Sequence, residues 1–213
     1  MIHIIGSTKP IQAVACSGGV DSMAALSFLR NGKHAVTAVF FHHGTETSEA
    51  AQSFVARYCG EQGIPFVAGR INGSKPPGLS PEEWWRNERY AFLHSLNMTI
   101  ATAHHLNDVA ETYLWGMMHG RTRHIHYIKP HEGEHSNVVR PFLLTKKTEL
   151  VSWCERHDVP WIEDTSNTDV AFTRNRIRHN IMPEVEQVNP GFLKVVERLT
   201  RSWLEESADL ESV

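Results

Sequence analysis

Two hydrophobic spacings alternate along the first two-thirds of the chain. Short apolar runs, of the length that suits buried strands, are each followed by a longer segment of helical composition. Strands that alternate with helices in this way predict a parallel sheet covered by helices, so we expect an α/β fold with a doubly wound parallel sheet. The expected strands are residues 11–16, 35–41, 64–68, 98–103 and 138–142.

The expected helices have recognisable ends. Gly32 and Gly63 stand just past two of them, and Ser80 precedes Pro81 and Glu83 in the order typical of a helix start. Polar composition predicts loops at 119–137 and 158–173, with a helical extension at the C-terminus. The expected helices are residues 21–31, 46–62, 81–96, 107–118, 145–157 and 190–209.

The composition is that of an ordinary folded domain. The chain has 213 residues, 41% hydrophobic and 21% charged, which argues against a disordered or collagen-like protein. Cys16, Cys59 and Cys154 are isolated in sequence, so no zinc ribbon, ligated iron–sulfur cluster or disulfide scaffold is indicated. No apolar run approaches a membrane span and the first residues do not resemble a signal peptide, so we expect a soluble, cytoplasmic protein.

The segment 16–22, between an expected strand and an expected helix, carries the clearest chemical signal. The adjacent glycines Gly18 and Gly19 let the backbone approach an anion, and the hydroxyls of Ser17 and Ser22 can donate hydrogen bonds beside a helix N-terminus. A plain glycine turn with a helix cap is the alternative for a lone Ser-Gly-Gly. The whole segment, in its strand–loop–helix setting, favours a phosphate-binding loop.

Asp21 narrows the kind of phosphate site. A carboxylate among phosphates repels them unless a divalent cation lies between, so Asp21 indicates a polyphosphate bound with Mg²⁺. The Walker-type P-loop pattern and the dinucleotide-binding glycine pattern are both absent. Residues 17–22 resemble instead the pyrophosphate-binding loop of the N-type ATP pyrophosphatases, enzymes that use ATP to adenylate an oxygen and release pyrophosphate.

A second polar cluster, residues 103–112, follows the fourth expected strand. Asp108 and Glu111 are three residues apart on one helical face, where they can hold Mg²⁺, receive a substrate ammonium or accept a proton. Acidic residues are also common in a first helical turn for their favourable interaction with the helix dipole, which is the alternative. One of His104 and His105 is expected to contact substrate or phosphate rather than zinc, because neighbouring strand residues point to opposite faces.

One short segment is densely basic. The formal net charge of the chain is −3, yet Arg174, Arg176, Arg178 and His179 lie within six residues. If the segment is helical, Arg174 and Arg178 share a face and can support an RNA backbone. A solvated helix surface is the ordinary alternative.

These segments together resemble the catalytic domain of the tRNA(Ile)-lysidine synthetase family. The resemblance covers residues 11–200 and implies an N-type ATP pyrophosphatase domain at 1–145 with a helical extension packed on it at 146–213. The further motifs that carry it are the segments 41–44, 86–90, 108–112, 140–143, 147–150, 164–167, 174–178 and 181–183.

The resemblance implies an enzyme that uses ATP and Mg²⁺. The substrates would be lysine and an isoleucine tRNA with a CAU anticodon, whose wobble cytidine is adenylated at C2 before lysine replaces AMP. Asp21, Asp108 and Glu111 would be catalytic, with Asp21 also a Mg²⁺ ligand. The implied ATP-binding residues are Ser17, Gly18, Gly19, Asp21, Ser22, His43 and His104.

The remaining implied residues would bind the tRNA or the lysine. Most are basic and lie in the later motifs of the chain. They are Arg86, Arg89, His105, Arg121, Arg140, Lys147, Asp164, Asn167, Arg174, Arg176 and Arg178.

Three features depart from the family pattern. Asn107 stands where the family usually has an aspartate, residues 120–126 replace a glycine-rich segment, and the sequence ends soon after Leu204, before the usual C-terminal domains. We therefore keep two alternatives, a minimal enzyme that adenylates another nucleobase and an ATP-binding module without catalysis. The cluster-dependent thiolation branch is disfavoured because its cysteine pairs are missing. The sequence does not give the oligomeric state.

Overall fold

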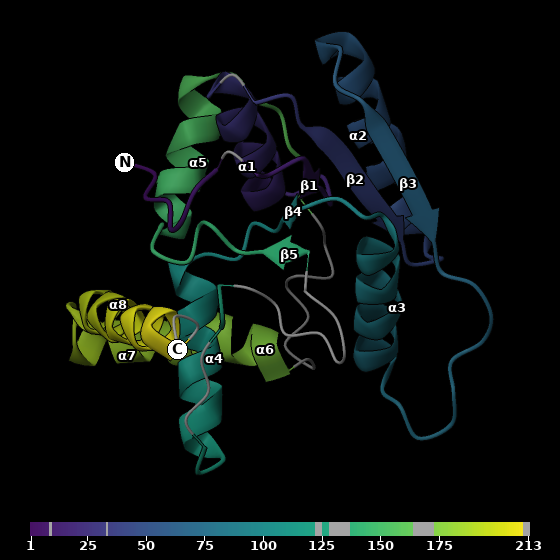
Figure 1. Ribbon diagram of the computed structural model, residues 1–213. Coiled ribbons are helices and arrows are strands. Elements are labelled where there is room, and N and C mark those ends of the chain that lie inside the picture. The colour runs from purple at the N-terminus through teal and green to yellow at the C-terminus, as the bar shows by residue number, and fades with distance from the viewer. Residues whose placement is uncertain (9, 33, 122–124, 128–136, 164–172, 211–213) are drawn as a thin grey trace.

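The computed structural model describes residues 1–8, 10–32, 34–121, 125–127, 137–163 and 173–210. Five parallel strands form one sheet in the order β3-β2-β1-β4-β5 (Figure 1). The chain therefore leaves β1 toward one edge of the sheet and returns to add β4 and β5 on its other side. This confirms the doubly wound parallel sheet. The strands are β1 Ala13–Ala15, β2 Thr37–His42, β3 Phe66–Arg70, β4 Ile100–Ala101 and β5 Val138–Val139.

Four of the five strands, β1, β2, β4 and β5, are shorter than the apolar runs that predicted them. β5 pairs with β4 through two residues only, with Ile100 opposite Val138 and Ala101 opposite Val139. An apolar run continues beyond β5 in Phe142 and Leu143, but these residues belong to a turn and are buried between helices. An apolar run indicates that its residues are buried, but a strand also needs a neighbouring strand to pair with. The apolar runs therefore overestimated the strand lengths.

Helices cover both faces of the sheet. The alternation of side chains along β1 shows which helices lie on which face. Val14 packs in one cluster with residues of α1, α2 and α5, whereas its neighbour Ala13 packs with Tyr90 and Leu93 of α3. Successive strand residues point to opposite faces, so α3 lies across the sheet from the other three helices. Their bounds are α1 Val20–Asn31, α2 Glu46–Gln62, α3 Pro81–Ser95, α4 Leu106–Met118 and α5 Lys147–Arg156.

The expected helix ends are largely present. Gly63 closes α2 with φ of 62°, in the left-handed region, and the Ser80 side chain accepts a hydrogen bond from the backbone N–H of Glu83 at the start of α3. Gly32 caps α1 with φ of −71°. The caps therefore explain where α2 ends and where α3 begins.

The C-terminal part of the chain is helical from residue 173 onward and packs on α4. Val109 and Ala110 of α4 share a buried cluster with Ile177, Met182 and Val196, and α8 lies across α4 (Figure 1). The division of the chain at 145/146 stays a prediction. The helices are α6 Thr173–Arg176, the π-helical turn η2 Ile177–Ile181, α7 Met182–Val188 and α8 Phe192–Leu210.

The run from α6 to α7 is helical, which fulfils the condition set on the prediction for Arg174 and Arg178, but it is not one regular α-helix. Pro183 has no N–H to donate to the carbonyl of His179, so a regular α-helix cannot continue through this point. The five-residue π-helical turn 177–181 lies directly before this proline and joins the two α-helical pieces.

Within the described residues, no helix combines the length and the hydropathy of a membrane span.

Candidate active site

The carboxyl ends of the parallel strands gather the polar segments singled out in the sequence. The phosphate loop follows β1, His42 and His43 come at the end of β2, His104 and His105 follow β4, and Arg140 follows β5. Parallel strands end at the same edge of a sheet, and in doubly wound folds this edge, beside the point where strand order reverses, is where ligands bind.

The phosphate loop is built by its own hydrogen bonds. The Ser22 hydroxyl donates to the carbonyl of Gly19 over 2.9 Å and accepts from the backbone N–H of Ser17 over 3.1 Å. Gly18 has φ of +89°, and the carbonyl of Gly18 accepts from the N–H of Ile162 over 3.0 Å. Ser22 therefore shapes the loop, while the exposed Ser17 lies at its surface.

The loop leads into the N-terminus of α1 without a side-chain cap. Gly19 is the N-cap residue and makes no side-chain hydrogen bond to the helix. The N–H groups of the first turn are therefore available to an anion, where the positive end of the helix dipole also favours negative charge.

Asp21 has one oxygen that is engaged and one that is not. Its Oδ2 lies 3.5 Å from Nε2 of His105 and 4.0 Å from Nζ of Lys147. Its Oδ1 is buried and has no hydrogen-bond partner among the described residues. A buried carboxylate oxygen without a partner is costly unless a donor or a cation satisfies it, so Asp21 fits a magnesium ligand.

The described residues offer no complete metal cage. No group of three or more His, Cys, Asp or Glu side chains is close enough to hold a metal among them. Magnesium commonly binds through one or two carboxylates together with phosphates and waters. The Asp21 site therefore fits a cation that arrives with a nucleotide.

Asp108 and Glu111 lie on α4 and face two arginines of the C-terminal helices. Nη2 of Arg174 and of Arg178 lie 3.3 and 3.2 Å from Oδ1 of Asp108. Glu111 accepts from Nε of Arg178 over 2.7 Å and from Nε of Arg174 over 3.2 Å. The two arginines expected to face RNA therefore form an ion-pair network with the two carboxylates expected to be catalytic, and their role in RNA binding stays a prediction.

His105 links this network to the phosphate loop. Its side chain is 1% exposed. His105 is the N-cap residue of α4: its Nδ1 accepts from the backbone N–H of Asp108 over 3.4 Å, and its backbone N–H donates to Oδ2 of Asp108 over 2.9 Å. Burial opposes its charged form, but the carboxylates of Asp108 and Asp21 outweigh this and raise the pKa of His105. Burial likewise favours a neutral Asp108, yet His105 and Arg174 hold the pKa of that carboxyl well below its ordinary value.

His104 has the opposite electrostatic character. Its Nδ1 is 2.8 Å from the hydroxyl of Thr102. Burial lowers the pKa of His104 well below its ordinary value, and Arg140 and Arg174 lower it further, against the effect of Asp108. His104 is therefore a neutral imidazole beside a group of arginines, whereas the carboxylates around His105 shift its pKa in the opposite direction.

Three of the expected substrate residues meet around a residue that the sequence did not single out. The guanidiniums of Arg86 and Arg89 lie over the ring of Tyr90, with Cζ 5.2 and 5.4 Å from its centroid. Nη2 of Arg140 donates to the Tyr90 hydroxyl over 3.2 Å. Arg86 and Tyr90 stand four residues apart in a helix, which was the one sequence signal for this contact.

The other expected residues are scattered. The backbone N–H of Lys147 donates to Oδ1 of Asn107 over 3.0 Å, so Asn107 ties α4 to the start of α5. The His43 ring packs 5.8 Å from that of Trp85. Arg121 and Arg176 are exposed and form no ion pair with a described residue. Asp164 and Asn167 lie outside the described residues.

This architecture matches a known class of nucleotide-binding proteins. The sequence profile of the PP-loop domain family fits residues 4–185, and the chain therefore belongs to this family. Its fold is similar to that of the U34-tRNA thiolase NcsA from Methanococcus maripaludis, with a TM-score of 0.74, 15% identity and coverage of 93% of this chain and 74% of that one.

Curated relatives narrow the comparison. The chain is 34% identical over 200 residues to the tRNA(Ile)-lysidine synthase of Thermotoga maritima. The matched region covers 87% of this chain and 48% of that protein. It is 30% identical over 197 residues to the tRNA(Ile)-lysidine synthase of Haemophilus ducreyi, with coverage of 89% and 45%. The chain thus spans about half the length of these relatives.

Proposed function

We propose that this chain forms the catalytic domain of an ATP-dependent ligase of the tRNA(Ile)-lysidine synthase type. The C2 oxygen of the wobble cytidine in an isoleucine tRNA attacks the α-phosphate of ATP, and pyrophosphate leaves. The ε-amine of lysine then attacks C2, and AMP leaves. One observation carries the proposal: Asp21 of the phosphate loop and Asp108 of the carboxylate pair lie on either side of His105, 3.5 Å from its two ring nitrogens.

The phosphate loop serves the first step. The N–H groups at the start of α1 face the position of the departing pyrophosphate and stabilise the charge that develops on it. Gly18 and Gly19 leave room for that approach, and Ser22 keeps the loop in shape before substrate binds. Little reorganisation is then needed when the bond breaks.

Asp21 is the residue that would hold Mg²⁺ through its unpartnered Oδ1. The ion, when bound, neutralises phosphate charge and assists the departure of pyrophosphate. His105 and Lys147 flank the other oxygen of Asp21 and fix the direction of its carboxylate.

Asp108 and Glu111 serve the second step as the receptor for lysine. Asp108 stays ionised because its pKa is held low, which makes it a weak proton acceptor and a good partner for an ammonium group. Arg174 and Arg178 already neutralise both carboxylates. The lysine ammonium must therefore share them with these guanidiniums or displace one.

A mutation of Asp21 tests this function. Asp21→Asn keeps the shape of the side chain and removes its charge; we expect no lysidine and at least a hundredfold loss of pyrophosphate release. Glu61→Gln, an exposed carboxylate on α2, is the matched control and should behave as wild type. Two measurements are made after incubation of a CAU-anticodon isoleucine tRNA with the protein, Mg²⁺, ATP and lysine: mass spectrometry of the tRNA nucleosides, and an assay of the pyrophosphate released.

The same reactions, with ATP binding measured alongside, separate the alternatives. Pyrophosphate release that depends on Asp21 but yields no lysidine would indicate a different base or amine. Bound ATP without any pyrophosphate release, across candidate tRNAs and amines, would reject catalysis by this chain and favour a nucleotide-binding module.

A further inference from the structure

The arginines at the candidate site fall into two sets with different electrostatic surroundings. Arg174 and Arg178 are paired with Asp108 and Glu111 at 2.7 to 3.3 Å. Arg86, Arg89 and Arg140 form no ion pair with any carboxylate in the described ranges. Those three guanidiniums converge on Tyr90 instead.

Gathering three cations without a counter-charge is unfavourable. Burial lowers the pKa of Arg89, and the neighbouring charges of Arg86 and Arg140 lower it further, against the effect of Tyr90. Arg140 is 3% exposed, and its Nε has no hydrogen-bond partner among the described residues. Such an arrangement is stabilised when an anion binds, because charge-assisted hydrogen bonds to a phosphate satisfy the guanidiniums.

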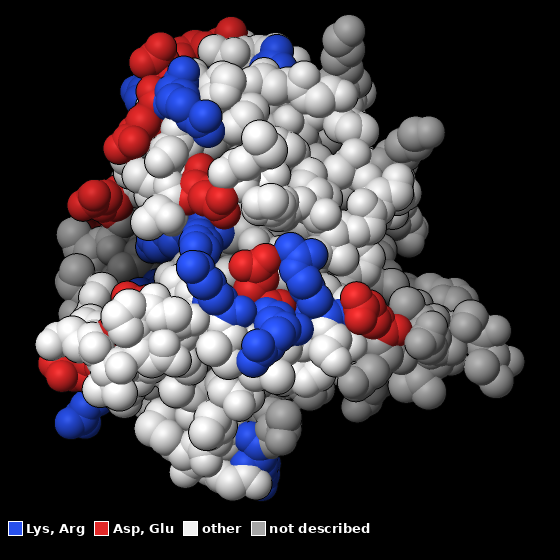
Figure 2. Space-filling model, turned by 90° about the vertical axis from the view of Figure 1, so that its left-hand side faces the viewer, with Lys and Arg blue, Asp and Glu red and all other residues white. Residues whose placement is uncertain are grey.

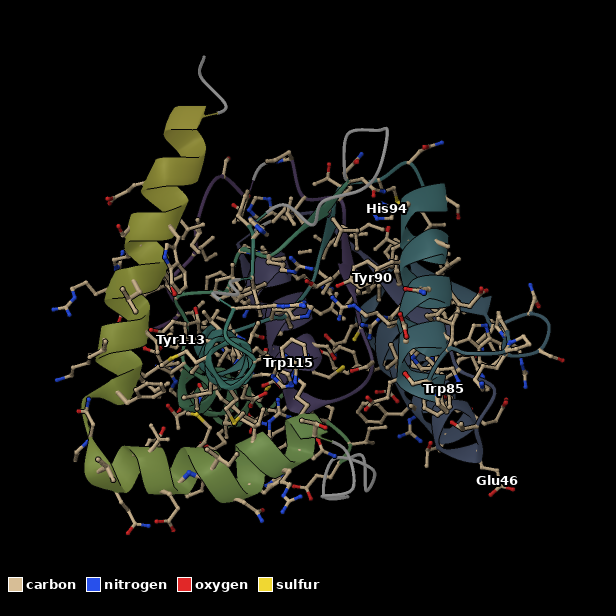
Figure 3. All side chains as sticks on the ribbon, turned by 90° about the horizontal axis from the view of Figure 1, so that it is seen from below. Glu46, Trp85, Tyr90, His94, Tyr113 and Trp115 are labelled. Atoms are coloured by element: carbon tan, nitrogen blue, oxygen red, sulfur yellow. The ribbon has the colours of Figure 1, made fainter. Side chains whose placement is uncertain are left out.

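Tyr90 holds this set together. It is 6% exposed, its hydroxyl accepts from Nη2 of Arg140, and its ring lies under the guanidiniums of Arg86 and Arg89. It lies on the flank of α3 that faces α4 (Figure 3). Nη1 of Arg140 is held in turn by the carbonyl of His126 over 2.9 Å. The arginines are therefore fixed before any ligand arrives.

We propose that Tyr90 is a positioning residue that holds Arg86, Arg89 and Arg140 as a preformed receptor for a phosphate group of the substrate. Arg86 is exposed and Arg89 partly so, while Arg140 is buried beside the Tyr90 hydroxyl. The phosphate approaches from the Arg86 side, and the buried Arg140 adds its field from below. This inference rests on the proposed function for the identity of the substrate.

The phosphate can come from ATP or from RNA, and one substitution distinguishes them. Tyr90→Phe removes the hydroxyl that holds Arg140 and keeps the ring beneath the other two arginines. We expect the dissociation constant of the phosphate-bearing ligand to rise about tenfold, as for the loss of one hydrogen bond to a charged donor. Tyr58→Phe is the matched control, because Tyr58 is 9% exposed and lies in the hollow between the ends of α1, α2 and α5.

The probes are a labelled CAU-anticodon stem-loop RNA and ATP with Mg²⁺, each titrated alone at 50 and 200 mM salt. Weaker RNA binding with unchanged ATP binding assigns the site to RNA, and the reverse assigns it to ATP; either supports the receptor. Unchanged affinity for both, or the same change in Tyr58→Phe, overturns it. These titrations need no lysidine formation, so a failed nucleoside assay does not affect them.

A double-mutant cycle separates positioning from general damage. Arg140→Lys keeps the charge but loses the fork that joins Tyr90 to His126, so we expect the same loss as for Tyr90→Phe and no further loss when both are combined. Additive losses would overturn the positioning role. If Tyr90→Phe does not fold, Arg140→Lys alone tests the receptor by the same two titrations, with unchanged affinity for both probes overturning it.

Discussion

Gly18 has φ of +89°, and a Cβ added there would lie 3.2 Å from the side chain of Ile162. Glycine is needed here both for its backbone conformation and for the close approach of the segment that follows α5. At the residue scale the phosphate loop is therefore specified by steric limits as well as by ligand chemistry, and the sequence pattern alone located it correctly after β1.

Gly18→Ala should reduce stability and ATP affinity together. We expect a loss of about 1–3 kcal/mol in the free energy of unfolding, the usual cost of a strained residue, and weaker ATP binding because the loop must shift. Gly60→Ala is the matched control, since an added Cβ there meets nothing within 4 Å inside α2; it should gain roughly 0.5–1 kcal/mol. Urea unfolding and ATP titration measure both. Equal stability of the two variants would contradict the strain argument.

Tyr90 shows the limit of prediction at this scale. Arg86, Arg89 and Arg140 were expected near substrate from the resemblance, but nothing in the sequence placed Arg140 against a residue of α3. That contact joins positions 50 residues apart. A hydrogen bond over such a separation follows from the packing of α3 against the sheet, which periodicity does not specify.

At the scale of elements, α6 and η2 are held to α4 by charge as well as by the apolar contact of Ile177 with the α4 residues Val109 and Ala110. Glu111 is 3% exposed, and Arg178 binds both of its oxygens. A buried carboxylate depends on such a partner, because removing one member of a buried pair leaves an uncompensated charge.

Arg178→Met should therefore destabilise the protein by up to about 3 kcal/mol, because Arg174 remains 3.2 Å from Glu111 and compensates part of its charge. The double variant Arg178→Met with Glu111→Leu should recover much of this loss, because it removes the charge together with its partner. Urea unfolding measures stability, and hydrogen exchange should show the variant's extra opening in α6 and η2. If the double variant lost as much free energy of unfolding as the two single variants together, the result would contradict a mutual ion pair. Arg201→Met, which removes a half-exposed guanidinium from the partly exposed Glu197, is the control and should cost under about 1 kcal/mol.

Over the whole molecule, acidic residues outnumber basic ones, with 24 Asp and Glu against 21 Lys and Arg. The chain carries a formal net charge of −3, and on the face shown in Figure 2 basic and acidic side chains lie intermixed. The compact arginine set around Tyr90 is therefore expected to supply only a few phosphate contacts to an RNA.

The salt dependence of RNA binding tests this. With two or three phosphate contacts, affinity for the isoleucine tRNA should fall about 7- to 40-fold between 50 and 200 mM salt. Fluorescence anisotropy of labelled tRNA measures it, and Glu61→Gln, away from the arginine set, should give the same slope. A fall of a thousandfold or more would mean a far larger basic surface than these residues supply.

Local sequence patterns were enough to predict the alternation of strands and helices, the doubly wound sheet, the position of the phosphate loop with Asp21, and the placement of Asp108 and Glu111 on one face of α4. Each of these depends on residues close together along the chain, through periodicity, capping or glycine conformation. For a helical segment, the sequence also predicted that Arg174 and Arg178 share a face.

Only the tertiary structure decided what those arginines contact. Arg174 and Arg178 were expected to face RNA or solvent, and the fold also brings them against carboxylates 63 to 70 residues away, while their role in RNA binding stays a prediction. Tyr90 was joined to Arg140 in the same manner. Partners at such separations are set by how α3, α4 and the C-terminal helices pack on the sheet, because packing geometry, and not local pattern, determines which charges meet.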